Sequence, residues 1–315
     1  MHLKDQSKVK GFLEKLYREG KLPGGFLFYG PPGVGKTTAA LDFAKGVLCL
    51  KGEAWGCNEC VSCIHYGRVV QDIVSGNWES ISVYEDSNGK RVFKYLSGEH
   101  PDFVYLPPLG GSIKIDQVRA LREFAYMRPA LSHRKVIIVD DAHTMTTEAG
   151  NAILKILEEP PADTLFILIS NGKEQVLPTI VSRTYQIEFF PLEEEAFYEL
   201  LGREDRDLYQ SSGGSYTVAK IIEEKGELIK LLSEFLSLRP DKVYEVAIKL
   251  DKREVEDKEL FLDLLEDKLR ETFLKEGLSY DRFDMLVKRI SEVRAGLGRG
   301  LRFSLGLLSL YALWR

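Results

Sequence analysis

Short, almost wholly apolar runs alternate with helix-like segments in the first half of the chain. In the helix-like segments apolar residues recur every three or four positions, as at Val118, Leu121 and Phe124. Strands that are continuous apolar runs are buried on both faces, which is typical of a parallel sheet covered by helices on both sides. The pattern therefore predicts an α/β domain with strands at FLFY (26–29), FVYL (103–106), VIIV (136–139) and LFILI (165–169).

The pattern of apolar positions differs before, between and after these strands. Apolar residues at helical spacing in segment 9–18 predict a helix before the first strand. Residues 80–96 place Asn88 and Gly89 between two β-prone segments, which predicts an inserted hairpin with a tight turn. After about residue 190 the strand pattern stops and helical spacing continues to the end, so the second half is predicted to be helical.

Length and composition narrow the class of protein. A chain of 315 residues exceeds the usual size of a single hydrophobic core, so we expect two or three domains. The most apolar run, 303–314, has twelve residues, whereas a membrane-spanning helix needs about 20, so we expect a buried core helix and no membrane span. The charged N-terminal segment lacks the apolar stretch of a signal peptide, which favours the cytoplasm. The net charge of -5 argues against nucleic-acid binding through a bulk positive field.

A phosphate-binding loop follows the first predicted strand. The segment matches the pattern GxxxxGK[ST] and precedes a predicted helix, as that motif requires. Backbone N–H groups and the helix N-terminus would bind phosphates, the lysine would reach the β and γ phosphates, and the threonine would ligate Mg²⁺. A ligand-free glycine turn, or an inherited loop with little turnover, remains an alternative. The expected contacts with ATP or ADP are Gly30, Pro31, Pro32, Gly33, Val34, Gly35, Lys36, Thr37 and Thr38.

A pair of aspartates follows the VIIV strand. Asp140 stands where a carboxylate that positions Mg²⁺ is needed, so we expect it to share the ion with Thr37. Asp141 stands where hydrolysing P-loop enzymes usually have a glutamate that orients the attacking water, and it is shorter by one methylene. Its catalytic role, and the chain's own hydrolysis, are therefore left open. Without a phosphate-binding loop, such a pair is often only a turn or a helix cap.

All four cysteines of the chain lie within fifteen residues of one another. A disulfide scaffold would not cluster thiols in this way, and four soft ligands with short spacers suit one tetrahedral Zn²⁺. A site closed by four thiolates leaves no position for water, so its role is expected to be structural. Reduced structural thiols, or replacement of one ligand by His65, are the alternatives. The expected ligands are Cys49, Cys57, Cys60 and Cys63.

Beyond these motifs, the chain resembles the clamp-loader ATPases of the AAA+ class. The resemblance runs through VDDAHTMTTEAGNAILKILEEPP (139–161), LFILISN (165–171) and LPTIVSR (177–183). Two bacterial branches of this family, gamma/tau and delta-prime, carry a comparable zinc module. His100-Pro-Asp102 and the segment 113–119 are similar to the delta-prime branch, as is the length of the chain.

This resemblance implies roles for three further positions. Arg183 occupies the arginine of the family's Ser-Arg-Cys motif, which projects into a neighbouring subunit's ATP site, although Thr184 replaces the cysteine. Asn171 matches the first sensor, a polar side chain near the γ-phosphate. At the second sensor the usual arginine is replaced by Thr217. Nucleotide binding with weak or absent hydrolysis is therefore expected.

The resemblance also implies the domain organisation and the partners. It implies an AAA+ domain at 1–188 with the zinc module at 49–63, a helical lid at 189–223 and a helical collar at 224–315. The partners would be the gamma/tau and delta subunits in a hetero-oligomeric ring of the DNA polymerase III holoenzyme, with the sliding clamp and primed DNA reached through the complex. The hairpin at 80–96 is not part of the family pattern.

Two other functions compete with a ring-completing subunit. One is a gamma/tau-like motor or a stand-alone P-loop ATPase whose own site turns over. The other is a DNA-binding module that uses the zinc module and a basic stretch, although a solvated helix face is the simpler interpretation of those charges. The basic residues are Arg119, Arg122, Arg128, Arg134 and Lys135.

Overall fold

The computed structural model describes residues 6–87, 90–108, 111–237, 239–276, 280–297 and 302–314. The chain divides into two compact units, Met1–Ala219 and Lys220–Arg315. The division falls within the long helix α9 (Tyr216–Leu236).

The first unit is built on a sheet of seven strands in the order β2-β3-β4-β5-β6-β1-β7. Strands β4, β5, β6, β1 and β7 run parallel to one another. The four apolar runs of the sequence are strands, as predicted. The edge strand β7 was not predicted, because only Ile187 of its four residues is buried. The bounds of the parallel strands are Gly25–Tyr29 (β1), Phe103–Leu106 (β4), Lys135–Val139 (β5), Thr164–Ser170 (β6) and Tyr185–Glu188 (β7).

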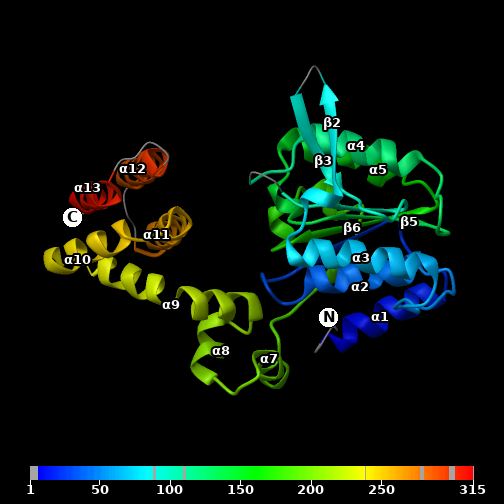
Figure 1. Ribbon diagram of the computed structural model, residues 1–315, viewed down its shortest axis with the longest axis horizontal. Coiled ribbons are helices and arrows are strands. Elements are labelled where there is room, and N and C mark those ends of the chain that lie inside the picture. Colours follow the sequence, from blue (N-terminus) through cyan, green and yellow to red (C-terminus); the bar gives the residue numbers. More distant parts are fainter. Residues whose placement is uncertain are drawn as a thin grey trace. The chain divides into compact units, whose positions relative to one another are not determined.

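Helices cover both faces of this sheet (Figure 1). Alternate strand residues face opposite ways: Phe26 and Phe28 pack into one hydrophobic cluster and Leu27 into the other. The predicted α/β class is confirmed. On the first face lie α1 (Ser7–Arg18), α2 (Lys36–Leu48) and α3 (Val61–Ser75), and on the second lie α4 (Ile115–Tyr126) and α5 (Thr147–Glu158).

The predicted hairpin is present and extends the sheet. Strands β2 (Ser82–Ser87) and β3 (Lys90–Leu96) pair antiparallel, after the 3₁₀ turn η1 (Glu79–Ile81). The predicted turn residues 88–89 lie outside the described residues. Pairing of Leu96 with Tyr105 attaches the hairpin to β4.

Short elements complete the first unit. Tyr209 of α8 donates from its hydroxyl to the carbonyl of Leu192 at 2.9 Å, and Phe197 of α7 is fully buried. The elements are η2 (Ala142–Thr144), η3 (Lys173–Gln175), α6 (Pro178–Val181), α7 (Glu194–Leu201) and α8 (Arg206–Ser212).

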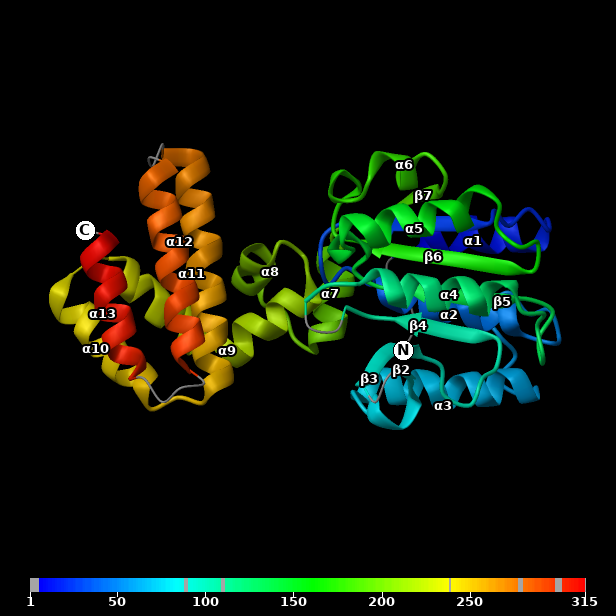
Figure 2. The ribbon, with the colours of Figure 1, turned by 90° about the horizontal axis from the view of Figure 1, so that it is seen from above.

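All the described elements of the second unit are helices, as predicted. Figure 2 shows α11 (Val255–Glu276) and α12 (Tyr280–Leu297) side by side, and the two helices are in contact. Helices α10 (Pro240–Asp251) and α13 (Phe303–Trp314) pack against each other and share one core with α11 and α12. The apolar run at 303–314 is therefore a core helix. Among the described helices, none is long and apolar enough to cross a membrane.

A buried polar network connects α2, α3, the start of β4 and the loop before β5. Asp102 is fully buried, and its carboxylate accepts three backbone N–H bonds, from Ala130 (2.7 Å), Leu131 (2.7 Å) and Ser132 (2.6 Å). Its own N–H donates to Nδ1 of His100 at 3.2 Å. The conformation of the 130–132 loop therefore depends on one buried carboxylate.

The same network fixes the protonation of His100. Because Nδ1 accepts a hydrogen bond, the ring proton lies on Nε2, which donates to the Ser62 hydroxyl at 2.9 Å. Ser62 in turn donates to the Leu48 carbonyl at 2.7 Å. Burial lowers the pKa of His100 to about 4. The segment His100-Pro-Asp102 thus joins the cysteine-bearing region to the sheet.

Replacing Asp102 by alanine is expected to destabilise the first unit by about 3 kcal/mol, because three buried N–H groups lose a charged acceptor. Urea unfolding measures this change. The control is Glu99→Ala, which removes only an exposed ion pair with Arg68 and should change the free energy of unfolding by less than about 1 kcal/mol. Equal effects of the two substitutions would contradict the role given to Asp102.

Stability should also fall in acid through His100. The folded protein keeps this imidazole neutral down to about pH 4, whereas the unfolded chain binds the proton near the ordinary value of 6.5. The unfolded state then holds more protons between these values, so the contribution is complete above pH 6.5 and is lost as pH falls towards 4, by about 3 kcal/mol. Unfolding titrations should show a shallower pH dependence of the free energy of unfolding for His100→Asn than for the wild type.

Candidate functional site

The phosphate-binding loop lies between β1 and α2 with a backbone that requires glycine. Gly30 has φ +148°, and a Cβ there would lie 2.2 Å from the carbonyl oxygen of Phe189. Gly33 has φ +72°, and a Cβ there would lie 2.3 Å from the Ser215 hydroxyl. Both values fall in the left-handed region that favours glycine. The loop is therefore closely packed against the end of β7 and the segment before α9.

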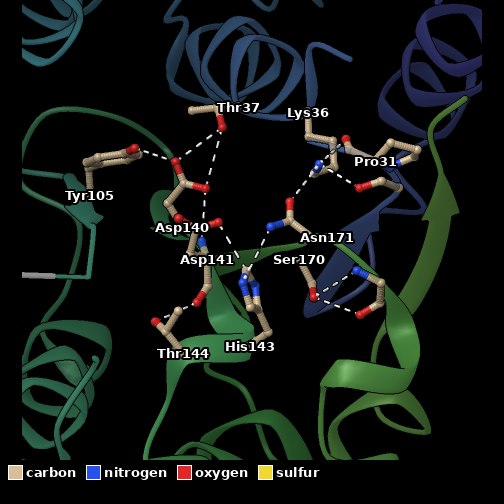
Figure 3. Close-up of polar contacts among 12 residues, drawn as sticks. Pro31, Lys36, Thr37, Tyr105, Asp140, Asp141, His143, Thr144, Ser170 and Asn171 are labelled. Atoms are coloured by element: carbon tan, nitrogen blue, oxygen red, sulfur yellow. Dashed lines mark hydrogen bonds and ion pairs between the residues drawn. The ribbon is translucent and has the colours of Figure 1, made fainter. Parts of the chain in front are cut away.

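Lys36 lies at the first turn of α2 and points into the loop (Figure 3). Its Nζ donates to the carbonyls of Gly30 (2.7 Å) and Pro31 (2.6 Å) and to Oδ1 of Asn171 (3.3 Å). Burial lowers the pKa of Lys36 to about 8, against the opposing effect of Asp140 and Asp141. The ammonium group is thus held where a phosphate would bind in a P-loop protein.

Asp140 follows β5 and is held by three donors (Figure 3). The Thr37 hydroxyl donates to its Oδ2 at 3.1 Å, and the N–H of Asp141 donates to its Oδ1 at 3.0 Å. The third donor is the hydroxyl of Tyr105 on β4. Burial raises the pKa of Asp140 above its ordinary value. The structure therefore brings Thr37 and Asp140 together as the sequence predicted, and adds Tyr105.

Asp141, His143 and Asn171 form a second group beside these residues. Asp141 has a left-handed backbone with φ +46°, and its side chain is about half exposed. Nδ1 of His143 lies 4.0 Å from Oδ1 of Asp141, and its Nε2 lies 3.5 Å from the Asn171 amide. Asn171 directly follows β6 and links this group to Lys36 through its amide oxygen.

Lys36, Asp140 and Asn171 line a pocket of about 440 Å³, within the range of small-ligand sites. Gly30 and Pro31 reach the site through their carbonyls, while Val34 is buried in the core. The predicted residues that line the pocket are Pro32, Gly33, Gly35, Lys36, Thr37, Thr38, Asp140, Asp141 and Asn171. Residues not predicted as ligands add an apolar and hydroxyl wall, formed by Ile169, Leu192, Leu200, Tyr216 and Thr217.

Arg183 is not among the residues that line this pocket. It follows α6, and its guanidinium is about one-third exposed. One terminal nitrogen forms an ion pair with Glu158 at 2.8 Å, and the other donates to the Thr179 carbonyl at 3.0 Å. The arginine therefore contacts α5 and α6 of its own chain and remains accessible to solvent.

The four cysteines converge at the end of α2 and the start of α3. Their sulfur atoms all lie within 4.8 Å of one another, with 4.0 Å between Cys57 and Cys63, and all four are free thiols. Backbone N–H groups of Glu59 and Cys60 point at Cys57 and lower its pKa to about 6. Four converging sulfurs, one of them readily ionised, fit the donor set of a tetrahedral zinc ion.

The comparisons with known proteins agree with these features. The model of the family described as DNA polymerase III, delta subunit, matches residues 5–193. A DNA polymerase III subunit delta' of Bacillus subtilis is 34% identical over 64% of this chain and 52% of its own length. A subunit delta' of Pseudomonas aeruginosa is 35% identical over 51% of this chain and 41% of its own length.

The chain is also similar to subunits of the gamma/tau branch. A DNA polymerase III subunit gamma/tau of Mycobacterium tuberculosis is 33% identical over 63% of this chain and 30% of its own length. The matched part thus spans between 30% and 52% of these relatives. Because the family's model matches more than half of the chain, this chain belongs to the DNA polymerase III, delta subunit family and is a member of the clamp-loader family.

Proposed function

We propose that this chain is a delta-prime subunit that completes the ring of a DNA polymerase III clamp loader. The observation that carries the proposal is the family match over residues 5–193, which spans the phosphate-binding loop, Asp140 and Arg183. In this proposal the chain joins gamma/tau and delta subunits in the cytoplasm and helps to load the sliding clamp onto primed DNA. Residues 189–223 serve as a helical lid and 224–315 as the collar that holds the ring together.

The proposed nucleotide site is the pocket around Lys36. Its geometry supports ATP or ADP binding, because a lysine ammonium, a glycine-rich loop and a helix N-terminus converge on one pocket. Thr37 and Asp140 would hold Mg²⁺, which would neutralise phosphate charge when bound. Asn171 accepts a hydrogen bond from Lys36, which supports a role in sensing the terminal phosphate.

The chain's own hydrolysis is proposed to be weak or absent. Asp141 is shorter than the glutamate that usually orients the attacking water. Thr217 lines the pocket where the family's second sensor usually supplies an arginine. The first difference shortens a group that would act on the attacking water and the second removes an arginine, while the phosphate-binding loop and Lys36 remain.

Arg183 is proposed to act on a neighbouring subunit's ATP. Its position outside its own pocket and its accessible guanidinium support a role in trans. A guanidinium placed against the transferring phosphoryl group stabilises charge that develops in the transition state.

A gamma/tau-like motor is the second candidate, favoured by the 33% identity to gamma/tau relatives. It differs from the first in one measurable property. A motor would hydrolyse ATP as an isolated chain and lose that activity on Lys36→Ala, whereas a ring-completing subunit would show little turnover alone.

The Arg183→Ala variant is expected to reduce the ATPase activity of a complex reconstituted with gamma/tau and delta subunits. At the one site that Arg183 serves, the rate should fall by roughly 10³-fold, because the arginine finger is lost there. The total ATPase activity of the complex should fall by the fraction that this one site contributes, as measured by steady-state phosphate release.

The control is Arg68→Ala, which removes an exposed arginine paired with Glu99 and should leave the rate unchanged. Arg183→Lys keeps the charge without the planar fork and should remain impaired. A complex gaining no activity from this chain, or losing none on Arg183→Ala, would contradict the trans role.

Zinc is proposed to bind the four cysteines as a structural ion. The purified chain should contain about one zinc per molecule by plasma mass spectrometry. Cys60→Ser should lose the zinc and lower the melting temperature, although serine can still accept the Cys63 N–H at the start of α3. Glu59→Ala, in the same loop, should retain the metal. The proposal would be contradicted if wild-type protein without zinc had the same melting temperature as the zinc-containing protein.

A further inference from the structure

The Tyr105 hydroxyl contacts the carboxylate of Asp140, and nothing in the sequence motifs accounts for it (Figure 3). Tyr105 lies on β4, one residue before its end, in register with Ile138 of β5. The side chain is only 5% exposed, and its ring packs in the core on the α1–α3 face of the sheet. The buried ring thus carries a single polar atom to the edge of the nucleotide pocket.

The direction of this hydrogen bond is fixed by chemistry. A tyrosine phenol is protonated at neutral pH, and an ionised carboxylate can only accept, so the Tyr105 hydroxyl donates to the carboxylate oxygen Oδ2. Oδ2 also accepts from the Thr37 hydroxyl, while Oδ1 accepts from the N–H of Asp141.

The three donors to Asp140 differ in whether they would also bind a metal ion. In a P-loop site the hydroxyl at the position of Thr37 would itself ligate Mg²⁺ through an oxygen lone pair, so the metal as well as Asp140 would set its position. The Asp141 N–H belongs to the backbone and holds the other oxygen. Tyr105 is the side-chain donor to Asp140 that would not itself bind the metal, so its hydroxyl restricts rotation of the carboxylate with or without Mg²⁺.

We propose that Tyr105 is a positioning residue that orients Asp140 for Mg²⁺ bound with a nucleotide. The inference rests on the proposed nucleotide site and adds a residue on a neighbouring strand to it. Partners that orient metal ligands typically change metal affinity by 10- to 100-fold when removed. The consequence of losing this hydroxyl is therefore specific to Mg²⁺ and does not extend to the metal-free contacts of Lys36 with phosphate.

The test compares Tyr105→Phe with the wild type and with a matched control. Phenylalanine keeps the ring in its apolar surroundings and removes only the hydroxyl. The control, Tyr66→Phe, removes an equally buried hydroxyl that donates to the Leu41 carbonyl at 2.8 Å, within the same core cluster. Binding of a fluorescent ADP analogue is titrated in a Mg²⁺ series and in EDTA, at a temperature below the melting transition of every variant.

In Tyr105→Phe, the Mg²⁺ concentration that gives half of the metal-dependent gain in affinity should rise about tenfold. Affinity in EDTA should stay at the wild-type value, and Tyr66→Phe should match the wild type in both buffers. An unchanged Mg²⁺ dependence in Tyr105→Phe, or an equal loss in EDTA, would overturn the inference alone. Absence of nucleotide binding by the wild type in both buffers would overturn the proposed nucleotide site together with it.

Discussion

The parallel register of β4, β5, β6 and β1 is the constraint on which the candidate site depends. Leu106 pairs with Val139, Val139 with Leu168, and Tyr29 with Ser170. The residues that follow these strands therefore emerge at one edge of the sheet, where the open ends of parallel strands commonly bind ligands. Lys36, Asp140 and Asn171 meet there although they are far apart in the sequence.

Two buried carboxylates of the first unit are each satisfied by several donors from different segments, which ties those segments together. Asp102 is surrounded by three N–H donors, and Asp140 by two hydroxyls and one N–H. A buried carboxylate without such partners would be strongly unfavourable, so each one specifies the conformation of the segments that supply its donors. The first carboxylate orders the 130–132 loop, and the second orders the pocket proposed to bind a nucleotide.

The sequence predicted the parts whose signal is local. Continuous apolar runs predicted β1, β4, β5 and β6, and the spacing of glycines and Lys36 predicted the loop between β1 and α2. Strand β7 was not predicted, because its short and mostly exposed segment has no apolar run. The role of Tyr105 was not predicted, because a tyrosine within an apolar run resembles a core residue. Its contact with Asp140 forms only because strands β4 and β5 pair.

The central claim is that this chain is a subunit of a clamp loader. The most direct test is whether it assembles with the other subunits. The purified chain would be mixed with the gamma/tau and delta subunits of the same organism and analysed by native mass spectrometry. The account predicts a hetero-oligomer that contains all three kinds of chain. A gamma/tau and delta complex from which this chain is absent, with the chain remaining free in the mixture, would contradict it.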